Sequence, residues 1–262
     1  MPVVVTSILN LIVVSRDGIN GIICEHSASE GITVLRFCEE FLQHMQQYHQ
    51  QQAPPPGSPS IRTSSLCSSY PVSRLSWDLG DDMLKALQDA TKAINTLAED
   101  VDLYILHFPN YGKNFIKEQR ISPDVYIQLA LQLTYYKVHR KLVSTYESAS
   151  LRKFYLGRVD NIRAATAQAL AWVQAMCDAV PATLATDKGI LVGYGAVVPD
   201  GYGCAYNIGA DQVSYVVSSF FSSPETSSDF FALSLEGSLL QMRELCLKRA
   251  TQLNMAPPPA RS

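Results

Sequence analysis

Hydrophobic and polar residues alternate along this chain in patterns that change from one segment to the next. Short apolar runs at residues 11–14 and 19–24 lie on either side of an Arg-Asp-Gly turn, and this arrangement predicts two strands. Apolar residues then recur every three or four positions over residues 34–45, which predicts a helix. The chain therefore begins with a mixed strand and helix segment.

The next segment, from residue 46 to about residue 74, lacks this periodicity. It contains three consecutive glutamines, a Pro-Pro-Pro-Gly sequence and a cluster of serines. Such a composition buries little apolar surface, so we expect a flexible connection here.

Helical repeats dominate the middle of the chain. Asp81 or Asp82 is predicted to cap a long helix, whose apolar positions recur every three or four residues: Met83, Leu87, Ala90, Ile94, Leu97, Val101 and Tyr104. Pro123 is typical of a first helical turn, and it predicts a helix through residue 138. Two further helices are expected at residues 164–179 and 227–254.

Strand patterns return between the last two helices. Residues 190–198 and 212–220 are rich in aliphatic and aromatic residues, and the Pro-Asp-Gly-Tyr-Gly sequence between them predicts a turn. Since helices and strands are mixed along the chain, the predicted fold class is α/β.

Charge and composition narrow the function classes. The net charge of −3 over 262 residues argues against nucleic-acid binding through bulk charge, and no apolar run approaches the roughly 20 residues that span a bilayer. Residues 113–163, however, hold ten Lys/Arg against four Asp/Glu. This basic segment can attract a compact polyanion, or it can form a solvated helical face. The six cysteines form no Cys-x-x-Cys pair, which predicts free thiols in a reducing cytoplasm and neither a zinc nor a redox site.

The first candidate for chemistry is His26, which follows a predicted strand. An imidazole can act as a general base, and a carboxylate such as Glu30, four residues later, can orient it. Other interpretations remain open at this point. His26 and Glu30 could bind a metal, although no third ligand is evident; Cys24 and His26 could form a thiol pair; or His26 could be a buried, hydrogen-bonded residue.

Other candidates lie in the basic segment and near the last strands. Lys113 and Lys117 are four residues apart, so they share a helical face and can hold a phosphate, although surface lysine pairs are common. Residues 145–150, 157–163 and 194–203 combine aromatic and small polar residues, which loop structure explains as well as function does.

Taken together and in this order, these segments resemble the choline/carnitine acyltransferases. The sequences Glu-His-Ser-Ala-Ser-Glu-Gly at 25–31, Thr-Tyr-Glu-Ser-Ala-Ser at 145–150 and Gly-Ala-Val-Val-Pro-Asp-Gly-Tyr-Gly at 195–203 carry the resemblance. It runs from about residue 11 to residue 246, outside the connection and a junction near 178–193.

This resemblance implies the CoA-dependent acyltransferase fold, in which two chloramphenicol-acetyltransferase-like α/β domains enclose an active-site tunnel. Residues 1–70 would be a remnant of the first domain, with the catalytic histidine segment and the flexible linker. Residues 71–262 would be the second domain, internally shortened near 178–193.

The resemblance also implies roles for individual residues. His26 matches the general base, with Glu30 as its helper. Lys113, Lys117 and Asp124 match the side that binds CoA. The residues that match the acceptor side are Tyr146, Ser148, Ser150, Val159, Asn161 and Tyr194. Acetyl-CoA would be a co-substrate, with no prosthetic group and no metal.

The acceptor implied is choline, since carnitine-type members have Thr on both sides of an Asp where this chain has Val159 and Asn161. Without polar partners, the carboxylate of carnitine would be buried unpaired at a high cost. A carnitine short-chain acyltransferase is the alternative. The resemblance further implies a cytoplasmic enzyme that is a monomer at full length.

The chain also departs from the family pattern. Family members are about twice as long, their first half has no counterpart here, and no Ser-Thr-Ser segment occurs in this sequence. That segment helps to stabilise the thioester oxyanion, and losing such a donor costs about 10²–10³ in rate. We therefore expect little activity from this truncated chain, and a catalytically inactive fragment that binds CoA or a protein partner is a further alternative.

Overall fold

The computed structural model describes residues 10–14, 17, 20–24, 31–52, 76–177 and 193–255. Helices and strands are mixed along the chain, as the predicted fold class requires. The chain divides into two compact units, Met1–Trp77 with Tyr155–Arg158, and Asp78–Phe154 with Val159–Ser262. The two units have separate internal contacts. The assignment of residues 1–70 and 71–262 to two acyltransferase domains stays a prediction.

The first unit contains a hairpin and one long helix. Strands β1 (Asn10–Val14) and β2 (Asn20–Cys24) pair in antiparallel register, which confirms both predicted strands. Helix α1 (Gly31–Gln52) contains the predicted helix but continues to Gln52. Residues 46–52, which we expected in the flexible connection, are therefore helical. Glutamine is a good helix former, and the first proline of this segment is Pro54.

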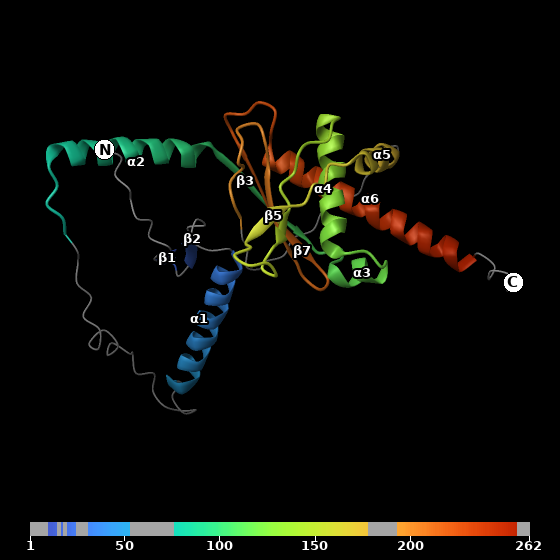
Figure 1. The fold of residues 1–262 in the computed structure, drawn as a ribbon, viewed down its shortest axis with the longest axis horizontal. Coiled ribbons are helices and arrows are strands. Elements are labelled where there is room, and N and C mark those ends of the chain that lie inside the picture. Colours follow the sequence, from blue (N-terminus) through green and yellow to red (C-terminus); the bar gives the residue numbers. More distant parts are fainter. Residues whose placement is uncertain are drawn as a thin grey trace. The chain divides into compact units, whose positions relative to one another are not determined.

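The second unit is built on a three-stranded antiparallel sheet. Its strands are β3 (Val101–Phe108), β7 (Val213–Phe220) and β6 (Gly203–Ile208), and β7 lies between the other two. Helices α4 (Pro123–His139) and α6 (Ser228–Met255) pack on one face of this sheet and on each other (Figure 1). Helix α5 (Ala167–Met176) packs against α4.

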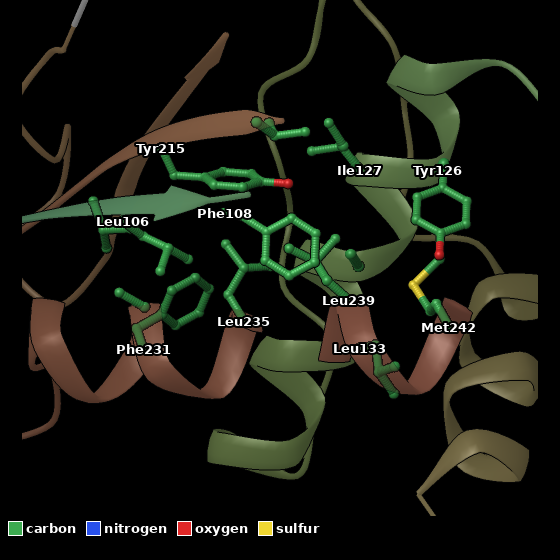
Figure 2. Packing of buried hydrophobic residues seen from close by; sticks show 14 of the residues in the cluster. Leu106, Phe108, Tyr126, Ile127, Leu133, Tyr215, Phe231, Leu235, Leu239 and Met242 are labelled. Carbon is green, nitrogen blue, oxygen red and sulfur yellow. The ribbon is translucent and has the colours of Figure 1, made fainter. Parts of the chain in front are cut away.

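One hydrophobic core joins these elements. Leu106 and Phe108 of β3 and Tyr215 of β7 lie on the same sheet face, because side chains alternate along a strand. They meet Leu235 and other side chains of α6, as Figure 2 shows. The core residues of α4 are Tyr126, Ile127, Ala130 and Leu133. Each fully buried aliphatic or aromatic side chain contributes about 1.5–3 kcal/mol to the stability of this unit.

Strand β3 contradicts the helix predicted through Tyr104. Helix α2 (Asp81–Asp100) ends at Asp100, and the next eight residues form β3. They pair with β7 over their whole length, from Val101 opposite Phe220 to Phe108 opposite Val213. The apolar spacing of Val101 and Tyr104 continues that of α2, but the β-branched and aromatic residues of this segment favour a strand that packs on a core.

The cap of α2 is also different from the prediction. Gly80 occupies the N-cap position and makes no side-chain cap hydrogen bond, whereas Asp81 and Asp82 lie in the first turn. There the two carboxylates interact favourably with the positive end of the helix dipole. None of the 20 residues of α2 is buried in this structure.

The predicted strand over residues 190–198 is wrong within its described part. Residues 193–198 form no strand, and the strand beside β7 is instead β6. Gly193 packs against β7 so closely that an added Cβ would lie 2.6 Å from Val216 Cγ1. The Ser218 hydroxyl donates a hydrogen bond of 2.8 Å to the Tyr194 carbonyl, so this segment is held by β7 through contacts other than strand pairing.

The remaining predicted elements of this unit agree with the structure to within a few residues. Helices α4 and α6 and strand β7 occupy the predicted segments. Helix α5 begins at Ala167, three residues later than predicted, because Thr166 caps it: the Thr166 hydroxyl accepts a bond of 3.1 Å from the Ala169 amide.

A polar network at the start of α6 fastens this helix to β3. Asp102 Oδ2 accepts bonds from the Ser228 amide at 2.7 Å and from the Ser219 hydroxyl at 3.0 Å. The Ser228 hydroxyl also donates to the Asp102 carbonyl at 2.9 Å. Ser219 and Ser228 are fully buried, so water cannot replace these bonds without a change in packing.

We predict that Asp102→Ala destabilises the second unit by about 1–3 kcal/mol, because it leaves the buried Ser228 amide and Ser219 hydroxyl without their shared acceptor. Chemical denaturation of the full chain measures this loss. Asp89→Ala, on the exposed surface of α2, is the matched control and should change the free energy of unfolding by less than about 0.5 kcal/mol. Equal effects of the two variants would contradict the anchoring role of Asp102.

Candidate functional site

Most of the predicted site residues lie in the second unit. His26 and Glu30 fall outside the described residues, so their roles stay predictions. The other nine are on α3, on α4, on a small hairpin, or in the loops that precede that hairpin and β6.

Helix α3 (Lys113–Glu118) carries the two predicted phosphate-binding lysines. Lys113 is its first residue and Lys117 lies one turn later, so both ammonium groups are on one face, and both residues are exposed. The backbone of the turn before β7 fixes the start of the helix. The Lys113 amide donates to the Gly209 carbonyl and the Asn114 amide donates to the Ala210 carbonyl, each at 2.9 Å.

Gly112 is the residue that allows this close approach. An added Cβ would lie 2.5 Å from the Gln212 nitrogen and 2.6 Å from the Gly209 oxygen, and both are backbone atoms. The Asn114 side chain adds a bond of 3.1 Å to Asp211 Oδ1. The position of the two lysines therefore depends on a contact between backbones that only glycine permits.

Asp124 lies in the first turn of α4, after the N-cap residue Ser122. The Tyr206 hydroxyl of β6 donates a hydrogen bond to Asp124 Oδ1, and Gln128 Nε2 donates to the Tyr206 hydroxyl at 3.0 Å. The Asp124 side chain is thus fixed from the sheet, although the residue itself is exposed.

Glu147, which the sequence did not single out as a site residue, is a buried carboxyl beside Asp124. Its pKa is raised, first because burial disfavours the charged form and then because Asp124 lies within hydrogen-bonding distance and carries like charge. Glu147 also lines a cavity of about 380 Å³ between α4 and α5, together with Gln128, Gln132 and Trp172.

Four of the predicted acceptor residues meet in one hairpin. Strands β4 (Ser148–Ser150) and β5 (Val159–Asn161) pair antiparallel, with Ser148 opposite Asn161 and Ser150 opposite Val159. Directly opposed residues on paired strands have Cβ atoms about 4.5–5.5 Å apart, and residues two apart share a face. The sequence predicted these four positions from two separate segments, and the structure places them together.

Asn161 has a structural role in this hairpin. Its side-chain Oδ1 accepts a bond of 2.9 Å from the Glu147 amide, and the Glu147 carbonyl accepts one of 2.8 Å from the Ile162 amide. The amide oxygen of Asn161 is therefore used inside the protein, which leaves its Nδ2 group as the donor that can face a ligand.

Two tyrosines complete the predicted acceptor set. Tyr146 and Tyr194 are 63% and 51% exposed, so each ring offers surface to a ligand. The Tyr194 hydroxyl donates to the Cys204 carbonyl at 3.4 Å. The pKa of Tyr194 is raised, mainly because burial of its hydroxyl disfavours the charged form.

The sequence missed Tyr206, Gln128 and Glu147 as members of this site. Glu147 is part of the Thr-Tyr-Glu-Ser-Ala-Ser sequence, so the sequence indicated a functional segment but could not predict that the Glu147 side chain is buried. Tyr206 shares one face of β6 with Cys204 and Ile208, but the sequence did not predict a strand here. The described residues contain no group of three His, Cys, Asp or Glu side chains that could hold a metal ion. No helix among them is long and apolar enough to cross a membrane.

Comparison of the sequence with known proteins identifies the family of this chain. The family described as Choline/Carnitine o-acyltransferase matches residues 9–190 and 182–237, which is most of the chain. The chain belongs to the choline/carnitine acyltransferase family. The resemblance on which the predicted site residues were based is thereby confirmed.

Individual relatives agree with this assignment. Choline O-acetyltransferase of Gallus gallus is 34% identical, over 90% of this chain and 46% of the relative. Choline O-acetyltransferase of Homo sapiens is also 34% identical, over 89% of this chain and 39% of the relative. Carnitine O-acetyltransferase of Rattus norvegicus is 29% identical, over 89% of this chain and 46% of the relative. The chain thus spans less than half the length of these relatives.

We predict that Gly112→Ala displaces α3 and destabilises the second unit by about 1–3 kcal/mol, because the new Cβ overlaps the backbone of residues 209–212. Amide hydrogen exchange at Lys113 and Asn114 should become faster, since their bonds to Gly209 and Ala210 break. The control is Gly195→Ala, where an added Cβ has no heavy atom within 4 Å. Unchanged protection of Lys113 in Gly112→Ala would disprove the role of this contact.

Proposed function

We propose that this chain is part of an acyltransferase that moves the acetyl group of acetyl-CoA to the hydroxyl of choline. Members of the family use acyl-CoA as a co-substrate. The observation that supports the acceptor site most directly is the pairing of Ser148 with Asn161 and of Ser150 with Val159. It joins four residues that the resemblance assigns to one substrate.

The donor side of the proposed site is α3 and the start of α4. Lys113 and Lys117 present two ammonium groups on one exposed face, which suits a phosphate of CoA. They belong to the basic segment at residues 113–163, so the excess positive charge lies where a polyanionic donor would bind. We propose that Asp124, held by Tyr206, contacts the uncharged part of the same donor.

The acceptor side of the proposed site is the β4–β5 hairpin with Tyr146 and Tyr194. A trimethylammonium group is attracted to the face of an aromatic ring, and both rings are partly exposed. Val159 supplies an apolar surface, and Asn161 Oδ1 is already bonded to the Glu147 amide. Neither residue offers a hydroxyl to a carboxylate, which favours choline over carnitine.

In the proposed reaction, His26 takes the proton of the choline hydroxyl while that oxygen attacks the thioester carbonyl of acetyl-CoA. The C–S bond then breaks, acetylcholine forms, and the CoA sulfur receives the proton. Glu30 would orient the imidazole of His26 and stabilise its charged form. Both assignments come from the family resemblance, as does the proposal that residues 1–70 and 71–262 belong to two domains of the family fold.

Two other functions remain as proposals with distinct tests. A carnitine acyltransferase would prefer the zwitterionic acceptor. The second alternative is a catalytically inactive chain that only binds CoA. It is supported by the sequence, in which no Ser-Thr-Ser segment is present to supply the oxyanion donor. Binding and turnover must therefore be measured separately.

We predict that Lys113→Ala combined with Lys117→Ala weakens CoA binding by the full chain more than tenfold at low salt. The loss should shrink as ionic strength rises, since salt screens exposed charge pairs. Isothermal titration calorimetry with CoA and with dephospho-CoA measures it. The control pair is Lys85→Ala with Lys92→Ala on α2, which should leave CoA affinity unchanged. Equal losses for CoA and dephospho-CoA would show that the lysines do not bind the 3′-phosphate.

We predict that Val159→Thr combined with Asn161→Thr, introduced into the full-length counterpart of this chain, shifts acceptor preference from choline toward carnitine by about tenfold or more, because two hydroxyls become available to a carboxylate. The ratio of kcat/KM for the two acceptors measures the shift, through CoA release from acetyl-CoA. His26→Ala, assayed in parallel, corrects for release that does not depend on the proposed base. A wild-type preference for carnitine would refute the proposed acceptor.

A further inference from the structure

We infer that Tyr111 and Arg243 are positioning residues for the proposed donor site: they fasten α3 to α6 and so fix Lys113 and Lys117 for the 3′-phosphate of CoA. The inference rests on the proposed function for the ligand of the two lysines. Neither Tyr111 nor Arg243 touches that ligand, and both act through α3. The attachment of α3 to α6 is a property of the fold, so it can be tested without a ligand.

The buried hydroxyl of Tyr111 makes two hydrogen bonds, and chemistry determines their directions. It donates to the Leu239 carbonyl of α6 at 2.7 Å, because a carbonyl oxygen can only accept. The Tyr126 hydroxyl of α4, 3.0 Å away, must therefore be the donor to Tyr111. Burial raises the pKa of Tyr111 well above its usual range, since it disfavours the charged form. The phenol thus keeps the proton that the bond to α6 requires.

Arg243 adds a second connection between α6 and α3. It follows Leu239 by four residues, so both lie on one face of α6. The Arg243 guanidinium carbon lies 5.9 Å from the ring centroids of both Tyr111 and Phe115, and these two rings are 4.8 Å apart. A cation at this distance is attracted to the face of an aromatic ring. Two successive turns of α6 therefore hold the residue before α3 and the middle of α3.

These contacts hold the side of α3 that faces away from the two lysines. Successive residues advance by about 100° around a helix, so Phe115 points nearly opposite to Lys113 and Lys117, which are two positions away on either side. Phe115 packs against the hydrophobic core, whereas both lysines are exposed. The lysines thus project from a helix whose opposite side is attached to α6.

The backbone bonds at the start of α3 cannot replace this attachment. They join only the first two residues of the helix to the turn before β7. A helix held at one end can still turn about that end, which would move Lys117 away from a phosphate bound by Lys113. The contacts of Tyr111 and Phe115 with α6 oppose such a turn, so both ammonium groups stay at one phosphate.

The first test compares amide hydrogen exchange in Tyr111→Phe and Tyr126→Phe versions of the full chain. Each variant removes one hydroxyl of the same buried pair, but only Tyr111→Phe breaks the bond to the Leu239 carbonyl. In Tyr111→Phe we expect the amides of Ile116 and Gln119, which are bonded within α3, to exchange about threefold or more faster than in wild type. In Tyr126→Phe their rates should stay near those of wild type. Equal rates in the two variants would overturn the inference.

Arg243→Met covers the case in which Tyr111→Phe does not fold. Methionine keeps an apolar side chain at this position but removes the charge over the two rings. The amides of α3 should again exchange about twofold or more faster. The matched control is Arg249→Met, which removes an exposed arginine from the same helix and should leave these amides unchanged. Unchanged exchange in a folded Arg243→Met protein would overturn the inference.

The second test is the ratio of the Kd for dephospho-CoA to the Kd for CoA, since the two ligands differ in the 3′-phosphate. A purely structural role would lower the thermal midpoint and leave this ratio unchanged. We expect the ratio to fall about threefold or more in Tyr111→Phe and in Arg243→Met, because the lysines lose their fixed position. Tyr126→Phe and Arg249→Met should keep the wild-type ratio.

The two tests separate this inference from the proposed function. A wild-type chain with a ratio near one would refute the proposed contact between the lysines and the 3′-phosphate, and hydrogen exchange would still decide the attachment of α3 to α6. A wild-type chain that discriminates between the two ligands, with the same ratio in Tyr111→Phe and Arg243→Met, would overturn the inference and leave the proposed function standing.

Discussion

The pairing of β3 with β7 is the constraint on which the second unit depends. Phe108, the last residue of β3, lies opposite Val213, the first residue of β7. The chain that leaves β3 therefore meets the chain that enters β7, and Gly112 packs against the turn at residues 209–212. The same pairing places Leu106, Phe108 and Tyr215 on the sheet face that packs against α6. Both the hydrophobic core and the position of α3 therefore depend on the pairing of β3 with β7.

Polar groups are fixed around this core in a consistent way. Asp102 joins β3 to the start of α6, Tyr206 joins β6 to α4, and Asn161 joins β5 to the segment before β4. Each of these contacts connects residues far apart in the sequence or on different elements. Because the partners are held by strands and helices, the proposed ligand groups lie at defined places although most of them are exposed.

The fold and the site differ in how well the sequence predicted them. Helices α4 and α6 were predicted to within a few residues, since helix signals such as Pro123 in the first turn of α4 are local features of the sequence. The sequence pattern predicts a helix over the start of strand β3, because Val101 and Tyr104 continue the apolar spacing of α2. The sequence predicted the neighbouring strand at residues 190–198 instead of at β6. The described part of that apolar run packs on β7 without pairing with it, and β6 is the strand that pairs.

The sequence by itself determined the family, the basic segment and the identity of the candidate side chains, because motifs and charges are properties of residue order. Only the tertiary structure decided that Ser148 lies opposite Asn161, that Gly112 touches residues 209–212 and that Tyr206 bonds to Asp124. Strand register and burial depend on residues distant in the chain. The shift in the pKa of Glu147 likewise requires its burial beside Asp124, which no local pattern encodes.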